Sequence, residues 1–351
     1  MDWIELGIVV LKSLLLVVVL LTGFAYTTLL ERKVIARMQS RIGPNRAGPL
    51  GLLQPLADGL KLMFKENITP FGVDTFVYFL APVVSLVVAI LAFAVIPIAD
   101  PISVELGGQV REIRFQIADF NVALLYVLGI SSLAVYGLVL AGWASNNKYS
   151  LIGGLRSSAQ MVSYELAMGL SLIGVVLLTQ TLSITEIVDT QSAWGLPLVV
   201  LQPVAFGIYV ITALAETNRA PFDFPEAEQE LVAGYHTEYT GMRFALFFMA
   251  EYINMITVSA VAASVFFGGY HLPFVERFVG DLPWFIDILV FTAKVIIGLF
   301  TFIWLRATIP RLRYDQLMSF GWKVLLPLSI ANVVITAAAV AWWQLSGPGA
   351  L

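Results

Sequence analysis

The sequence contains no cysteine, and only 13% of its 351 residues are charged. Without cysteine the chain can form no disulfide, no thiolate-ligated zinc site and no cysteine-held iron–sulfur cluster. Any redox centre that the protein serves must therefore lie in a partner. Soluble domains average about 25% charged residues, so roughly half of the usual charge is missing, which excludes an ordinary soluble enzyme.

Long stretches have no charge at all. Five runs contain no Asp, Glu, Lys or Arg: Ser13–Leu30, Thr75–Ala99, Phe120–Asn147, Leu166–Thr185 and Thr190–Ala215. Each reaches the roughly 18–20 residues that a helix needs to cross a bilayer. The sequence therefore predicts an all-α polytopic membrane protein.

We predict one transmembrane domain over residues 1–351 with about eight transmembrane helices. The predicted spans are residues 6–30, 76–99, 120–142, 157–180, 194–215, 243–267, 283–305 and 323–345. The first run is a span rather than a cleavable signal, because Asp2 and Glu5 occupy the region where a signal peptide is positively charged.

Residues 31–75, between the first two spans, form a strap and a surface helix. The strap begins with the turn-rich, arginine-bearing segment that follows Arg41. After it, apolar residues recur at helical spacing over 50–66, with Asp58, Lys61 and Lys65 between them. This pattern predicts an amphipathic helix lying on the membrane surface or under a docked subunit.

Basic residues predict the orientation. The odd-numbered loops contain fifteen Lys and Arg residues and the even-numbered loops contain three. Because basic residues concentrate on the cytoplasmic side, we expect the odd loops inside and both termini outside. The predicted location is a bacterial inner membrane, or the mitochondrial inner membrane for an organellar protein.

Soluble-type catalytic and binding motifs are absent from the sequence. The spacing of Gly43 and Gly48 resembles a phosphate-binding loop, but Pro49 and Leu50 stand where Lys and Ser or Thr are required. The only histidines, His236 and His271, fall in loops on opposite membrane faces and cannot jointly hold a haem. We predict no metal site.

Three ionisable residues fall at similar depth inside the predicted spans: Glu165, Glu251 and Lys294. An ionised side chain at the bilayer centre costs at least about 2.5–3.5 kcal/mol, so such groups face the bundle and pair or relay protons. We expect a proton relay, because one amine can pair with only one of the two carboxylates, which leaves the other acid without a partner. The alternative is a structural pair, with Lys294 bound to a carboxylate.

The inner loop over residues 216–242 is acidic. It contains six carboxylates (Glu216, Asp223, Glu226, Glu228, Glu230 and Glu238) against the single basic residue Arg219. Crowded carboxylates raise one another's pKa and can share protons near neutral pH. The alternative is a solvated acidic surface, but the interleaved Phe222, Phe224 and two prolines argue against it.

Long motifs spread along the chain resemble one family, the membrane subunit designated H of respiratory NADH:quinone oxidoreductase (complex I), the counterpart of the mitochondrial subunit 1. The matching segments are ERK from Glu31, RIGPNR from Arg41, GLLQPLADGLK from Gly51, SNNKY from Ser145, QMVSYE from Gln160, AETNRAPFD from Ala215, EAEQELVAGYHTEY from Glu226 and WLRATIPRLRYDQLM from Trp304. They extend from the first span to the start of the last.

The resemblance implies the bilayer-side part of a quinone tunnel and a coupling path for protons. The residues implied at the tunnel are Glu31, Arg32, Arg41, Asp58, Arg219, Phe222, Phe224 and Arg306. The carboxylates implied in relay and coupling are Glu165, Glu216, Asp223, Glu226, Glu228, Glu230 and Glu251, to which the depth argument adds Lys294. No acid lies in the third span, so a relay must pass it through water or other spans.

The resemblance also implies the partners. Ubiquinone or menaquinone is the expected substrate, whereas NADH, FMN and the iron–sulfur clusters belong to other complex I subunits, soluble ones on the inner face and antiporter-like or small membrane subunits at the side. Membrane lipid is a further expected contact, and nucleic acid is not expected. Two alternatives remain: the related membrane subunit of a hydrogenase-type complex, and a stand-alone secondary transporter with a midplane site.

Overall fold

The computed structural model describes residues 3–106, 109–224, 232–274 and 283–346. Seven helices of this described part are long and apolar enough to cross a membrane. They are α1 (Trp3–Met38), α3 (Thr75–Ala92, continued by a 3-10 turn to Val95), α4 (Ala123–Ala144), α5 (Lys148–Thr179), α10 (Gly241–Phe267), α12 (Trp284–Thr308) and the continuous unit of α13 (Tyr314–Phe320), η4 (Gly321–Leu325) and α14 (Leu326–Ser346). The predicted all-α polytopic membrane fold is confirmed.

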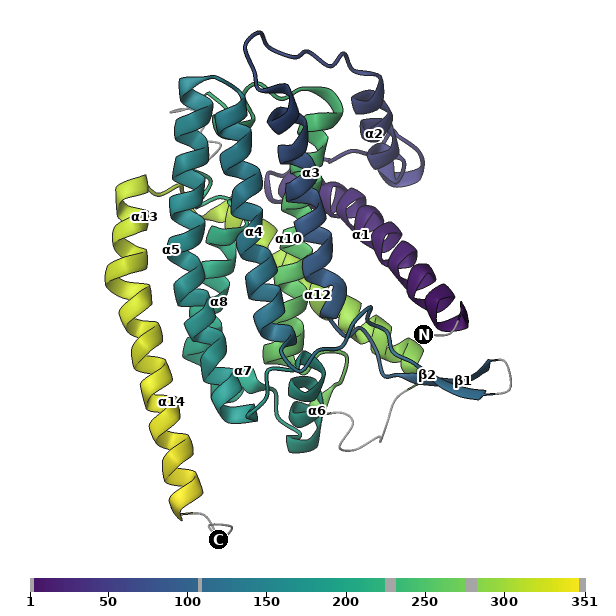
Figure 1. Ribbon diagram of the computed structural model, residues 1–351, viewed down its shortest axis with the longest axis vertical. Helices are drawn as coiled ribbons and strands as arrows, with labels where there is room; N and C mark the ends of the chain where they lie inside the picture. Colours follow the sequence, from purple (N-terminus) through teal and green to yellow (C-terminus); the bar gives the residue numbers. More distant parts are fainter. Residues whose placement is uncertain (1–2, 107–108, 225–231, 275–282, 347–351) are drawn as a thin grey trace.

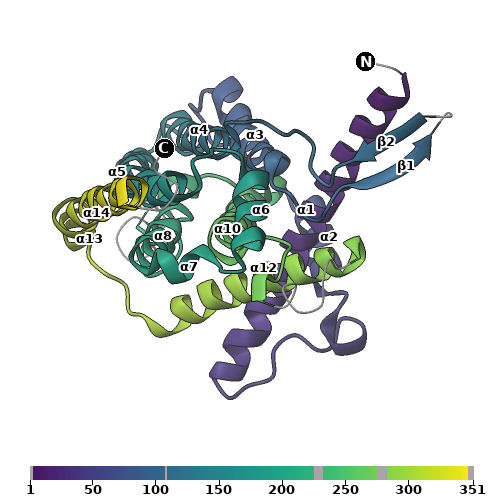
Figure 2. The same ribbon diagram turned by 90° about the horizontal axis from the view of Figure 1, so that it is seen from below.

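The helices form a bundle around α10. In α10, 67% of the most apolar stretch is buried, against 11% in α1 and 17% in the α13–α14 unit. Figure 1 shows α3, α4, α5 and α10 standing side by side, with α1 leaning away on one side and α14 at the opposite edge. Seen from below, α12 runs obliquely past α10 toward α1 (Figure 2). The most exposed helices are thus those at the two edges.

The fifth predicted span is broken. It consists of α7 (Leu198–Leu201) and α8 (Pro203–Glu216), with the non-helical residue Gln202 between them. Gln202 is buried, donates a hydrogen bond to Thr336 (2.8 Å) and accepts one from Asn332 (3.1 Å) in α14. Its amide is therefore satisfied by α14, as a buried polar group in a membrane requires.

Small residues allow the helices of the bundle to approach closely. A Cβ atom added at Gly137 in α4 would lie 2.0 Å from the Ser85 hydroxyl oxygen in α3. One added at Gly142 would lie 2.5 Å from the carbonyl oxygen of Ser150 in α5. Such contacts between backbones are typical of membrane helices, which pack through small residues.

The two ends of the bundle differ. At one end, the strap and α2 (Gln54–Phe64) extend beside α1, and none of the α2 residues is buried. The opposite end carries α6 (Ile184–Trp194) and an antiparallel hairpin of β1 (Ile102–Leu106) and β2 (Gln109–Ile113). An ion pair between Arg111 and Glu5 (3.6 Å) ties the hairpin to the start of α1. No strand was predicted in this segment.

Candidate functional site

A cavity of about 680 Å³ lies at the end of the bundle that carries α2, between α1, the strap, α2 and α10. Its wall combines aromatic and methionine side chains with charged groups. The charged wall residues are Glu31, Arg32, Arg41, Asp58, Lys61 and Arg306. Phe24, Phe244, Phe248, Met63, Met242 and Met249 supply much of its apolar surface. The cavity therefore suits a ligand with a polar head and an apolar body.

Salt bridges attach α2 to α1 at the mouth of this cavity. Arg32 pairs with Asp58 at 2.6 Å, and Asp58 also lies 3.6 Å from Lys61 one turn further along α2. Lys33 donates a hydrogen bond to the carbonyl oxygen of Leu50 (2.6 Å). The side chains of Arg32 and Asp58 are 49% and 24% exposed, so solvent weakens this pair.

Behind the cavity wall lies a buried cluster of charges. Arg219, only 6% exposed at its side chain, pairs with Glu31 of α1 (3.3 Å) and with Glu251 of α10. Glu31 also pairs with Arg306 of α12 and accepts a hydrogen bond from the Tyr252 hydroxyl (2.5 Å). Two carboxylates and two guanidinium groups balance in charge, which is the condition under which buried ions are tolerated.

Tyr252 also holds the cluster together. Its ring lies against the Arg219 guanidinium, with 4.1 Å from Cζ to the ring centroid, and its hydroxyl reaches Glu31. Glu31, Tyr252 and Arg306 line the cavity, whereas Arg219 and Glu251 do not. Glu31 therefore connects the cavity wall to the interior through Arg219.

Local backbone geometry positions Arg219. It follows the end of α8, where Asn218 adopts a left-handed conformation (φ 50°) that turns the chain back into the bundle. Gln160 of α5, fully buried, holds this turn by contacts to the carbonyl oxygens of Ala215 (2.7 Å) and Phe222 (2.9 Å) and to the Asn218 side chain (3.2 Å). The loop is thereby held from a neighbouring helix.

Two small cavities continue from the charge cluster into the bundle. Each has a volume of about 30 Å³. A cavity of about 10–15 Å³ is large enough for one water molecule, so each can hold water. Glu251 and Glu216 border the first, Glu216 and Ser131 border the second, and Asn254 borders both. One carboxylate oxygen of Glu216 is buried and has no hydrogen-bond partner among the described residues, so a water in either cavity would satisfy it.

Glu165 lies beside this region. It accepts a hydrogen bond from Ser132 of α4, the neighbour in sequence of the cavity residue Ser131. The third predicted span, which has no acid, thus contributes hydroxyl groups next to the carboxylates.

His236, in the loop before α10, does not add to this charge. Burial lowers its pKa to about 4, so the side chain is neutral at neutral pH.

Comparison with known proteins identifies the family. The family model described as NADH dehydrogenase matches residues 11–337. The chain is 60% identical to the NADH-quinone oxidoreductase subunit designated H of Protochlamydia amoebophila, over 90% of its own length and 92% of the relative's. It is 50% identical to the corresponding subunit of Thermomicrobium roseum over the full length of both chains, and 50% identical to one from Geobacter sulfurreducens over 94% of each.

The chain belongs to the NADH dehydrogenase family. The predicted membership is confirmed, and with it the prediction that the chain is a subunit of an oxidoreductase complex. Its multi-pass helical fold agrees with a membrane subunit of that family.

The structure brings together most, but not all, of the residues predicted for this family member's quinone tunnel. Glu31, Arg32, Arg41, Asp58 and Arg306 line the large cavity, and Arg219 lies directly behind it. Phe222 and Phe224 do not line it. They are buried elsewhere, Phe222 near Tyr164 (ring centroids 6.0 Å apart) and Phe224 near Tyr314 (5.9 Å).

The predicted coupling residues are likewise divided. Glu165, Glu216 and Glu251 lie in the region of the small cavities. Asp223 does not border these cavities and pairs with Arg311 (3.4 Å) in the segment before α13. Glu226, Glu228 and Glu230 lie outside the described residues.

Lys294 is not grouped with Glu251, contrary to the expectation from depth. Its ammonium donates to the carbonyl oxygens of Phe267 (2.8 Å), Gly269 (2.7 Å) and His271 (2.5 Å), at the C-terminal end of α10. Glu251 lies sixteen residues before Phe267 on the same helix, or about 24 Å at the helical rise. Glu251 pairs instead with Arg219.

Four residues of the site were missed in the sequence: Tyr252, Ser132, Gln160 and Asn254. A weak signal was present, because each is a polar side chain inside a predicted span. Uncharged polar residues are frequent in membrane helices, however, and only their tertiary contacts distinguish these four from the rest.

Proposed function

We propose that this chain forms the membrane-side wall of the quinone site of NADH:quinone oxidoreductase and transmits charge changes at that site to carboxylates inside the bilayer. The observation that carries the proposal is the double role of Glu31. This residue lines the large cavity and is also paired with Arg219, which in turn binds Glu251.

The lining of the cavity supports a quinone as its ligand. Charged groups at its mouth, among them Arg32, Arg41 and Asp58, suit a polar headgroup, and the aromatic and methionine side chains suit an isoprenoid tail. The relatives carry the word quinone in their name. Ubiquinone and menaquinone fit this description equally.

The electrostatics of the buried cluster support coupling. Reduction of a quinone to the quinol adds two electrons and two protons, so the headgroup changes charge until the protons arrive, and any side chain that supplies a proton changes charge as well. In a low-dielectric interior such a change acts strongly over short distances. A change of charge in the cavity beside Glu31 would alter how Arg219 divides its ion pairs between Glu31 and Glu251.

A route for protons leads inward from this cluster. Glu251 and Glu216 border one water-sized cavity, and Glu216 and Ser131 border the next. Ser132, which follows Ser131 in α4, donates a hydrogen bond to Glu165. Water in these cavities would connect the carboxylates by hydrogen bonds. We assign to Glu165, Glu216 and Glu251 the transfer of protons or of protonation-dependent structural change toward neighbouring membrane subunits.

The remaining parts of the reaction fall to partners. The chain has no cysteine to hold an iron–sulfur cluster, so the clusters belong to other subunits of the complex, and we assign NADH and FMN to those subunits as well. The fifteen-to-three distribution of basic residues supports an inner-membrane orientation with both termini outside. Single cysteines at positions 2 and 148, labelled with an impermeant reagent on intact cells, test this; labelling at 148 alone contradicts it.

Photoaffinity labelling tests the quinone site. The intact complex is illuminated with an azidoquinone and digested, and we expect label in residues 24–63 and 242–252, removed by excess quinone. The matched comparison is the segment around Phe222 and Phe224, which is buried but outside the cavity. Label concentrated there, with none in the cavity segments, would overturn the proposed site.

A further inference from the structure

A second membrane-embedded crevice lies on the far side of the α8 helix from the carboxylates. It measures about 190 Å³ and is enclosed by α8, α10 and α12. Its wall is mainly apolar, with Lys294 and the hydroxyl-bearing residues Ser259 and Thr301 as polar groups. Ile297 in this wall is 64% exposed, so the crevice reaches the perimeter of the bundle.

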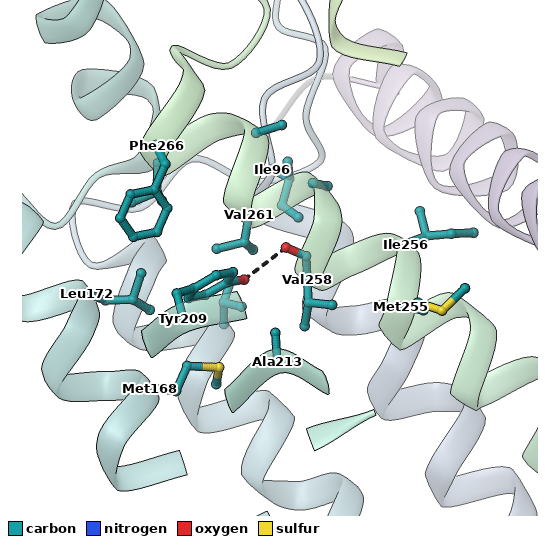
Figure 3. Packing of buried hydrophobic residues seen from close by; sticks show 14 of the residues in the cluster. Ile96, Met168, Leu172, Tyr209, Ala213, Met255, Ile256, Val258, Val261 and Phe266 are labelled. Atoms are coloured by element: carbon teal, nitrogen blue, oxygen red, sulfur yellow. Dashed lines mark hydrogen bonds between the residues drawn. The ribbon is translucent and has the colours of Figure 1, made fainter. Parts of the chain in front are cut away.

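Tyr209 of α8 borders both this crevice and the small cavity next to Glu216. The residue is only 2% exposed, and its ring packs near Phe266, 5.5 Å between centroids. Figure 3 shows the ring among Met168, Leu172 and Val261, with its hydroxyl directed at the carbonyl oxygen of Val258 (2.9 Å). One aromatic side chain thus stands between the two spaces.

We propose that Tyr209 is a proton barrier, which keeps the carboxylate region at Glu216 separate from the crevice that leads along α12 to Lys294. The inference rests on the proposed proton role of Glu216. A protein that moves protons across a membrane must prevent their return. An apolar ring without water around it interrupts the chain of hydrogen-bonded water molecules along which protons could move.

The chemistry of both spaces makes such a barrier necessary. Ser131, Asn254 and Glu216 on one side, and the hydroxyl groups of Ser259 and Thr301 on the other, could each hold water. Lys294 itself contacts carbonyl groups at the C-terminal end of α10. Without the Tyr209 ring, a continuous water file could run from Glu216 to that end.

The hydroxyl of Tyr209 has a positioning role. Its hydrogen bond to Val258 fixes the ring across the opening and satisfies the only polar atom of the side chain. The ring, and not the hydroxyl, therefore forms the barrier.

The test measures passive proton flux through the intact complex reconstituted in liposomes without NADH, driven by a potassium diffusion potential. Tyr209→Ala should raise the proton conductance several-fold over the native complex. Phe206→Ala is the matched control, because Phe206 is an aromatic residue of the same helix that lines the crevice but not the Glu216 cavity. Tyr209→Phe should stay at the native level.

The double variant Tyr209→Ala/Glu216→Gln should return the conductance to the native level, since the leak would begin at Glu216. Equal leaks in Tyr209→Ala and Phe206→Ala would overturn the proposal, as would a leak that Glu216→Gln does not reduce or a leak in Tyr209→Phe. If Tyr209→Ala does not assemble, Tyr209→Leu and Phe206→Leu give the same comparison.

Proton pumping driven by NADH is also measured for the single variant Glu216→Gln. This measurement distinguishes the proposed proton role of Glu216 from the proposed barrier role of Tyr209. Normal pumping would reject the proton role of Glu216, while the passive leak of Tyr209→Ala would still report whether the ring separates the two spaces.

Discussion

Arg219 and Lys294 are both basic residues inside the helix bundle, and the protein neutralises them in different ways. Arg219 is surrounded by the carboxylates of Glu31 and Glu251. Lys294 donates to three backbone carbonyl oxygens at the end of α10. A carboxylate can take up a proton and a backbone carbonyl cannot, so the carboxylates around Arg219 can respond to charge, while the three carbonyl contacts of Lys294 stabilise a helix terminus.

The contacts of Lys294 assign it a different role from the one expected from its depth. A depth argument from the sequence groups it with Glu165 and Glu251, whereas its contacts give it the role of a cap on the C-terminal end of α10. Arg219, which lies in a loop and attracts no attention by depth, is the cation at the centre of the carboxylates. Three substitutions test this difference, and a fourth tests an exposed ion pair for comparison.

The largest effect is expected from Arg219→Met. The substitution leaves Glu31 and Glu251 buried with less positive charge, and breaking such a pair costs about 3–5 kcal/mol. We expect loss of the assembled complex, measured by native gel and by quinone reductase activity of the membranes. Arg219→Lys should retain part of both, because lysine keeps the charge but loses the planar fork. Native assembly and activity in Arg219→Met would contradict the assigned role.

Glu251→Gln should have a smaller effect on stability and a clear effect on coupling. Arg219 keeps Glu31 as a partner, so the expected loss is that of one charged hydrogen bond, about 1.5–3 kcal/mol. The complex should assemble but move fewer protons per quinone reduced. Adding Lys294→Met should restore nothing, because distant sites act additively within about 0.3–0.5 kcal/mol. Rescue by Lys294→Met would show that these residues form a pair after all.

Lys294→Met alone should lower thermal stability without altering the ratio of protons moved to quinone reduced. A cation at a partly buried helix C-terminus contributes up to about 2 kcal/mol. The measurement is the melting temperature of the purified complex together with pumping in liposomes. Native stability together with a loss of proton pumping would show that Lys294 takes part in the proton relay.

The smallest effect is expected at the exposed pair of Arg32 and Asp58. Exposed ion pairs contribute about 0.2–1 kcal/mol, and salt screens them. Because this pair attaches α2 at the mouth of the large cavity, Arg32→Ala should raise the KM for quinone more than it lowers kcat, and the difference should shrink at high salt. Asp58→Asn serves as the partner variant. A loss of kcat that is independent of salt would indicate direct contact with the substrate instead.

Much of the fold could be predicted from local patterns. Charge-free runs long enough to cross a bilayer predicted the membrane helices, and the helical spacing of apolar residues over 50–66 predicted an amphipathic helix where α2 lies. The break at Gln202 and the hairpin at Ile102–Ile113 were missed. Apolar composition conceals a break whose polar groups are satisfied by another helix, as Asn332 and Thr336 of α14 do for Gln202.

The sequence by itself determined the class of the protein, its family and the identities of most charged residues at the site. Only the tertiary structure decided which of them meet. Glu31 and Arg219 are 188 residues apart, and Lys294 reaches α10 at a different level from Glu251. Hydropathy records whether a segment lies in the bilayer, but the tilt and rotation of each helix depend on packing against its neighbours. Those two quantities decide which side chain faces which.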